Sequence, residues 1–120
     1  MQGLRMSLSE KQRVFAKLVG KLLTWIYENG YEVTFGDAYR SPEMAAFYAN
    51  KGKGIKNSLH CLKLAIDLNL FKDGKYLDAT EAHRPIGKYW ESLGTEDCKT
   101  VWGGRFGDGN HYSIKHEGRA

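Results

Sequence analysis

The sequence predicts an α+β fold in which helices flank a small antiparallel sheet. Three observations lead to this prediction. A long segment near the N-terminus carries apolar residues at helical spacing, later segments alternate as strands do, and an Asp-Gly pair joins two strands as a hairpin. In chain order the expected elements are helix, strand, helix, hairpin, helix and strand, and such a mixed order is typical of α+β domains.

The first expected element is a long amphipathic helix over roughly residues 10–29. Ser9 followed by Gln12 forms a capping-box signature at its start, and Gly30 stops it. Apolar residues recur along it at helical spacing: Val14, Phe15, Leu18, Val19, Leu22, Leu23, Trp25 and Ile26. We interpret this stripe as a face that packs on the core.

A strand and a short helix are expected next. The segment "YEVTFGDAYR" has the β-branched and aromatic content of a strand. Ser41 as N-cap and Pro42 at the first helical position predict a helix directly after it. Arg40 is therefore expected at a strand-to-helix junction.

The second half of the chain begins with a basic loop, "KGKGIKN". A strand is expected over residues 64–71, and Asp73-Gly74 is a strong hairpin-turn signal. A helix is expected from about Thr80 to Leu93, with Pro85 in or near its first turn, and Gly94 stops it. The last stretch, "VWGGRFGDGNHYSI", is glycine-rich and ends in a short strand.

Composition limits the class of protein. The 120 residues are 42% hydrophobic and 27% charged, which suits one domain, residues 1–120, with no separate binding domain. The two cysteines are too few for a disulfide scaffold and are expected to be reduced. The N-terminus is too polar for a signal peptide, and no apolar run is long enough for stable membrane insertion. The net charge of +4 indicates a solvated basic surface, and the scattered Lys and Arg argue against nucleic acid.

The stretch "SLHCLKLAID" carries two potential metal ligands, His60 and Asp67. Because they are seven residues apart, an unbroken strand would point them to opposite faces. We therefore expect a loop or bulged turn over residues 58–63 and a regular strand from about Leu64. Asp67 then lies opposite the core face, which is formed by Leu64, Ile66, Leu68 and Leu70.

His111, at the start of the last strand, could join His60 and Asp67. Two imidazoles and one carboxylate suit catalytic zinc, which would activate a water for hydrolysis. Asp108 could accept the proton, and the planar fork of Arg40 could meet an oxyanion or a carboxylate. The alternative is that the histidines are ordinary solvated residues and that Asp108 in "FGDGN" is turn chemistry.

These residues resemble the zinc D-alanyl-D-alanine carboxypeptidase and dipeptidase family. Ser58, His60, Ala65 and Asp67 fit its pattern S-x-H-x-x-G-x-A-x-D, and "DGNH" fits its second motif. The segments "AYRSPEM", "SLH...LAIDLNLF" and "WGGRFGDGNHY" resemble its phage branch of L-alanyl-D-glutamate endopeptidases, which act as endolysins. The resemblance covers roughly residues 35–114 and implies the small fold shared by lysostaphin-type peptidases, D-Ala-D-Ala peptidases and hedgehog domains.

By this resemblance His60, Asp67 and His111 would bind Zn²⁺, Asp108 would be the general base, and Arg40 would orient or polarise the substrate. Two positions depart from the pattern. Lys63 stands where the pattern has glycine, and in carrying a basic residue there the chain is similar to phage-type members. Asp108 stands where many relatives carry glutamate.

Other residues have weaker expectations. Ser58 is expected to fix the loop that presents His60, with substrate binding as the alternative. Trp102 either walls a substrate cleft or packs under the Gly103-Gly104 turn. His83 and His116 are expected at the surface, and Cys61 is expected to pack.

The function expected from the resemblance is zinc-dependent hydrolysis of the peptidoglycan stem peptide at the L-Ala-D-Glu bond by a monomeric phage or prophage endolysin. It would stay in the host cytoplasm until a holin-type protein opens a route to the peptidoglycan. One alternative is a D-Ala-D-Ala carboxypeptidase, in which the "KGKGIK" loop could bind a terminal carboxylate. The other is a non-enzymatic, hedgehog-like binding module that contains zinc.

Overall fold

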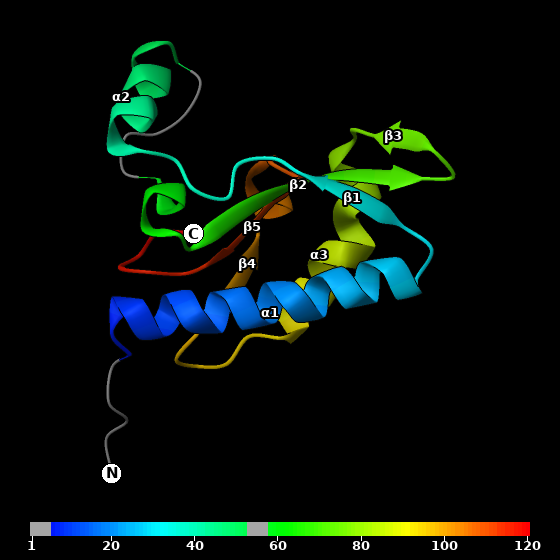
Figure 1. The fold of residues 1–120 in the computed structure, drawn as a ribbon, viewed down its shortest axis with the longest axis horizontal. Coiled ribbons are helices and arrows are strands. Elements are labelled where there is room, and N and C mark those ends of the chain that lie inside the picture. Colours follow the sequence, from blue (N-terminus) through cyan, green and yellow to red (C-terminus); the bar gives the residue numbers. More distant parts are fainter. Residues whose placement is uncertain (1–5, 53–57) are drawn as a thin grey trace.

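Three α-helices and a five-stranded antiparallel sheet form the part of the chain that the structure describes, residues 6–52 and 58–120 (Figure 1). In this computed structural model the helices are α1 (Leu8–Glu28), α2 (Pro42–Asn50) and α3 (Arg84–Ser92). The strands are β1 (Glu32–Phe35), β2 (Ala65–Lys72), β3 (Lys75–Leu77), β4 (Thr100–Trp102) and β5 (His111–Ile114). Three short 3₁₀ helices connect them, η1 (Leu59–Leu62), η2 (Thr80–His83) and η3 (Gly103–Phe106). The expected α+β class is confirmed.

The sheet has the strand order β1-β2-β5-β4, and β3 pairs with β2 as a hairpin. Asp73 and Gly74 both have left-handed backbones, with φ of 52° and 76°, as a type I′ turn requires. In the centre of the sheet, Ile66 pairs with Tyr112 and Asp67 pairs with His111. Since neighbours along a strand face opposite ways, these two pairs lie on opposite faces.

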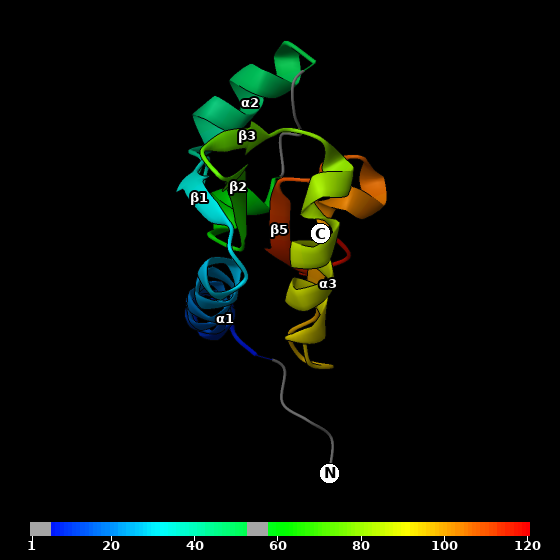
Figure 2. The same cartoon turned by 90° about the vertical axis from the view of Figure 1, so that its right-hand side faces the viewer.

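The helices α1 and α3 cover one face of this sheet, while α2 lies beyond the other (Figures 1 and 2). The core between the sheet and the two helices α1 and α3 contains Leu22 and Ile26 of α1, Trp90 of α3 and Tyr112 of β5, none of which is exposed. Burying one such side chain contributes about 1.5–3 kcal/mol. The core residues expected in and just before β2 are confirmed, since Leu64, Ile66, Leu68 and Leu70 are all at most 6% exposed.

The first helix starts earlier than its expected capping box. Ser7 is the N-cap: its Oγ accepts a hydrogen bond from the Glu10 N–H at 3.1 Å, and Glu10 Oε1 accepts one from the Ser7 N–H at 2.9 Å. The prediction of Ser9 with Gln12 was wrong. A carboxylate suits the positive end of a helix better than a neutral amide, which favours the earlier pair.

Several connections also differ from expectation. The first strand ends at Phe35, so Arg40 follows a loop of residues 36–39. The single helix expected from about Thr80 is divided into the 3₁₀ helix η2 and the α-helix α3. Pro85 has no N–H with which to continue one unbroken series of helical hydrogen bonds. β4 is three residues long, which is too short to show the alternation of apolar and polar residues that predicts a strand. Residues 53–57 of the expected basic loop lie outside the described residues.

The surface assignment of His83 was wrong, and His116 is only partly exposed. His83 is 3% exposed, and its Nδ1 lies 2.8 Å from the Tyr112 hydroxyl in the core; burial lowers the pKa of His83 to about 4. His116 is partly buried, with its Nδ1 3.1 Å from Lys11 Nζ. Both partners are distant in sequence, so local pattern could not reveal them. No helix in the described ranges has the length and apolar character to cross a bilayer.

Candidate metal centre

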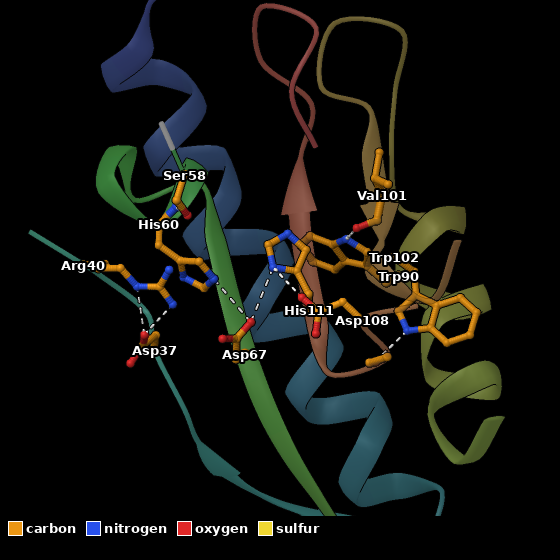
Figure 3. Close-up of polar contacts among 11 residues, drawn as sticks. Asp37, Arg40, Ser58, His60, Asp67, Trp90, Val101, Trp102, Asp108 and His111 are labelled. Atoms are coloured by element: carbon orange, nitrogen blue, oxygen red, sulfur yellow. Dashed lines mark hydrogen bonds and ion pairs between the residues drawn. The ribbon is translucent and has the colours of Figure 1, made fainter. Parts of the chain in front are cut away.

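Two neighbouring strands bring Asp67 and His111 together. The residues are directly paired between β2 and β5, and their side chains point away from the face that α1 and α3 cover (Figure 3). Opposed residues on one face of an antiparallel pair have Cβ atoms about 4.5–5.5 Å apart. The sheet register therefore sets the separation of these two side chains.

His60 is supplied by the 3₁₀ turn η1, which interrupts the chain just before β2, as the spacing of His60 and Asp67 predicted. The turn is capped by Ser58, whose buried Oγ accepts a hydrogen bond from the His60 N–H at 3.1 Å. It ends at Lys63 in the left-handed region, with φ of 57°. A glycine adopts this conformation at no steric cost, which explains the glycine of the family pattern at this position.

The nitrogens of His60 and His111 each approach Asp67 at the separation of two ligands around one ion. Asp67 Oδ1 lies 3.3 Å from His60 Nε2 and 3.4 Å from His111 Nδ1, and each of the three residues offers a ligand atom within 4.8 Å of the others. Ligands about 2.0–2.1 Å from a tetrahedral zinc ion are separated by roughly 3.3–3.4 Å. The arrangement therefore fits the expected zinc site.

Three buried polar atoms of this site, His60 Nδ1, Asp67 Oδ1 and His111 Nε2, make no hydrogen bond within the described residues. Asp67 Oδ1 is buried and makes no well-aligned hydrogen bond despite its two close nitrogens. A shared cation satisfies such an oxygen, whereas a buried acceptor without a partner is costly. Burial acts to raise the pKa of Asp67, but the close rings of His111 and His60 outweigh it and lower the pKa to about 2. The side chain of Asp67 is thus ionised, as a carboxylate that binds a metal must be.

Asp108 lies next to this group but outside it. Its Oδ2 is 3.9 Å from His111 Nδ1, and its side chain is 53% exposed. Burial of the carboxyl group and the negative charge of Asp67 raise its pKa, against the opposing charges of His111, His60 and Arg40. A carboxylate beside the ligands with a raised pKa has the position and basicity of a general base.

Arg40 reaches the site from the loop before α2. Its Nη2 and Nε lie 2.7 Å and 3.1 Å from one oxygen of Asp37, and its guanidinium lies 5.2 Å from the centre of the Tyr48 ring. Its backbone N–H donates to the His60 carbonyl at 3.2 Å. Figure 3 shows the side chain beside His60, on the side away from Asp108.

Trp102 lies under the glycine turn that carries Asp108 to His111. It is 4% exposed, and its Nε1 donates to the Gly109 carbonyl at 2.7 Å. A Cβ on Gly104 would overlap the indole. Of the two interpretations, the structure supports packing under the turn.

Phe106 is a residue near the site that sequence reasoning missed. It is 54% exposed, and its ring centre lies 5.8 Å from that of His111. It also lines a cavity of about 850 Å³ that extends along Val101 to Lys99 and Lys115. In the sequence, Phe106 could have been noticed as an aromatic residue within a glycine-rich turn. Asp37 was missed as well, because its segment looked like a continuing strand.

Comparison with known proteins gives matches only among solved structures. No family model matches the chain, and no curated protein matches it. The L-Ala D-Glu endopeptidase ChiX of Serratia marcescens has a TM-score of 0.71 at 16% identity, over 93% of this chain and 89% of that one. A zinc complex of VanY, a vancomycin-resistance D,D-pentapeptidase, has a TM-score of 0.55 at 17% identity, over 83% and 70%. The chain shares the fold of these peptidases, as the resemblance implied.

Proposed function

We propose that this chain is a zinc-dependent peptidase that cleaves the stem peptide of peptidoglycan. The observation that carries the proposal is the cluster of His60, Asp67 and His111, in which Asp67 Oδ1 lies 3.3 Å and 3.4 Å from a nitrogen of each histidine and Asp108 lies just outside. A structural zinc site normally has four protein ligands, whereas a catalytic one has three and an open position. The shared fold with two peptidases supports the same class of reaction.

Each residue has a separate task in this proposal. His60, Asp67 and His111 hold the ion, which when bound acidifies a water and polarises a carbonyl group. Asp108 accepts the proton of the attacking water and passes it to the leaving amine. Arg40 donates hydrogen bonds to a substrate oxygen next to the scissile bond.

The bond we propose is the one between L-Ala and D-Glu. The structure with the larger overlap is an endopeptidase for this bond, and the sequence resemblance implies the same branch. A carboxypeptidase for terminal D-Ala is the second candidate, favoured by the likeness to a D,D-pentapeptidase. It would need a cation for the free terminal carboxylate, and residues 53–57 of the basic loop expected to supply one lie outside the described residues.

The biological role we propose is that of a phage or prophage endolysin, acting as a monomer. The enzyme would wait in the host cytoplasm and reach the peptidoglycan through lesions made by a holin-type protein. These points rest on the sequence resemblance. A hedgehog-like module that binds zinc without cleaving remains the non-enzymatic alternative, and activity decides between them.

The test is a digestion of purified peptidoglycan by the zinc-loaded protein, by the chelated protein and by the chelated protein with zinc restored. The proposal expects new D-Glu amino termini in the first and third digests and none in the second. His111→Ala serves as the site variant, and Lys17→Ala, an exposed change on α1, as the matched control. Free D-Ala would establish the carboxypeptidase instead. Zinc binding without any product would leave the binding module.

A further inference from the structure

A cavity of about 850 Å³ lies beside the candidate metal centre, and the proposed function has given it no task. Phe106 lines it, and the ring centre of Phe106 lies 5.8 Å from that of His111. From Phe106 the cavity extends along Val101 of β4 to Lys99 and Lys115. It therefore leads from a metal ligand to a pair of lysines.

The part of the cavity around the two lysines has a net positive charge. The Lys115 N–H donates to the Lys99 carbonyl at 2.9 Å, which holds the two residues side by side. Both are exposed, and neither ammonium group makes a hydrogen bond or an ion pair in the described part of the chain. Two carboxylates also line the cavity, Glu91 and Glu96. Both oxygens of Glu91 accept hydrogen bonds from Arg105 at 2.6 Å, so that Glu96 remains against two lysines.

The leaving part of the substrate is expected on this side of the centre. In the proposed function Asp108 passes a proton to the leaving amine, which must therefore come within reach of Asp108. Asp108 lies two residues after Phe106. Figure 3 shows Asp108 and Val101 on the side of His111 that is away from Arg40. A peptide that continues from the leaving amine would thus pass Phe106 and enter the cavity.

The distance to the lysines suits the second residue of that peptide. Lys115 is four residues after His111, which along a strand is about 13 Å between their Cα atoms. An extended peptide covers about 3.3–3.6 Å per residue. D-Glu in a stem peptide covers more, because it continues through its side chain and keeps its α-carboxylate free. The carboxylate of the residue after D-Glu would lie roughly 7–10 Å beyond the scissile bond, and a lysine side chain can cover the remaining gap.

We infer that this cavity binds the part of the stem peptide that follows the scissile bond, and that Lys99 and Lys115 select for a carboxylate on the residue after D-Glu. The inference rests on the proposed function, since it names where the leaving peptide of that reaction lies. The free α-carboxylate of D-Glu is compatible with it, because the cavity is positively charged. An exposed ion pair contributes up to about fivefold in affinity. Removing both lysines should therefore lower the preference for the carboxylate by at least about threefold.

The experiment compares two synthetic tripeptides, L-Ala-D-Glu-L-Ala with a γ-linked D-Glu, that differ only in a free or an amidated last carboxyl group. The α-carboxylate of D-Glu is kept in both. The ratio of kcat/KM for the acid over the amide should exceed one in the wild type and fall at least about threefold in the double variant Lys99→Gln with Lys115→Gln. Lys115→Arg keeps the charge and should keep the ratio. Lys75→Gln, which changes an exposed lysine on β3, is the matched control and should also keep it.

Two further measurements distinguish charge selection from a structural role. Raising the ionic strength from about 0.1 M to about 1 M shortens the screening length from about 10 Å to about 3 Å, so the wild-type ratio should fall toward that of the double variant. Calorimetric affinities of the zinc-loaded proteins for both tripeptides give the same ratio without turnover. A wild type that cleaves both tripeptides equally well, or a double variant with an unchanged ratio, would overturn the inference and leave the proposed peptidase standing. Tighter binding of the acid without cleavage would support the cavity as a binding site and count against the peptidase.

Discussion

Replacing Asp108 by alanine should separate proton transfer from metal binding. The carboxylate lies 3.9 Å from His111 Nδ1, outside the group of three ligand atoms, and its side chain is 53% exposed. No hydrogen bond of this side chain is present among the described residues. We therefore expect Asp108→Ala to keep one zinc ion per chain and nearly the thermal stability of the wild type, while losing most of its turnover.

The size of the loss follows from the chemistry and from the surroundings of the carboxylate. A positioned general base contributes about 10²–10⁴-fold, which corresponds to about 2.7–5.5 kcal/mol in the barrier. Burial and the charge of Asp67 raise the pKa of Asp108 in the metal-free chain, and the charge of a bound Zn²⁺ would oppose this shift. At least a hundredfold loss is expected. Because the base acts when deprotonated, activity should fall with decreasing pH through the pKa of Asp108, and Asp108→Ala should lack that limb.

The assay measures zinc by elemental analysis and turnover on purified peptidoglycan from the same preparation. Asp108→Glu should lose less, because the longer side chain keeps its basicity while shifting its position. Asp78→Ala, another exposed aspartate, is the matched control and should behave as the wild type. Retained zinc with near-normal cleavage would remove Asp108 from the mechanism. Lost zinc would make it a fourth ligand and the site structural.

Three further predictions concern the ligands and the core. Single alanine substitutions of His60, Asp67 and His111 should each abolish stoichiometric zinc and activity, and full metal content in all three would contradict the assignment. Asp67→Asn should bind zinc more weakly, measured by chelator competition, because it keeps an oxygen donor but loses the charge; unchanged affinity would contradict this. His83, with a pKa of about 4 against 6.5 when unfolded, should favour the folded state fully above pH 6.5 and lose up to about 3 kcal/mol as pH falls toward 4. Urea unfolding of the chelated protein should show that this dependence is reduced in His83→Gln, and an identical dependence would refute it.

Features with a local cause could be predicted from the sequence. The N-cap Ser41 with Pro42 and the Asp73-Gly74 turn carry their conformations in adjacent residues, and both are found as expected. β4 and the burial of His83 depend on partners far along the chain. The three-residue edge strand forms because it pairs with β5, and His83 is buried because the Tyr112 hydroxyl is there to pair with it. Neither feature produces a periodic pattern in the sequence.

The candidate metal centre was predictable to a different degree at each residue. The parity of His60 and Asp67 required an interruption, and the structure has η1 there. The pairing of Arg40 with Asp37 could not be predicted, because Asp37 lies in a segment that has the composition of a strand. In the structure the strand ends just before Gly36. There the backbone approaches so closely that a Cβ would lie 3.0 Å from the Asp67 Cβ. Such an approach depends on the tertiary fold, which local propensity does not contain.

The placement of the ligands is a consequence of the core. The register that pairs Asp67 with His111 also pairs Ile66 with Tyr112, and these two are at most 6% exposed on the opposite face. A slip by one residue would turn the apolar residues of β2 outward and the carboxylate inward, at the cost of burying a charge. The hydrophobic packing of α1 and α3 therefore excludes the registers in which the ligands would be apart. A substitution such as Ile66→Ala should accordingly weaken zinc affinity as well as stability, although Ile66 faces away from the ion.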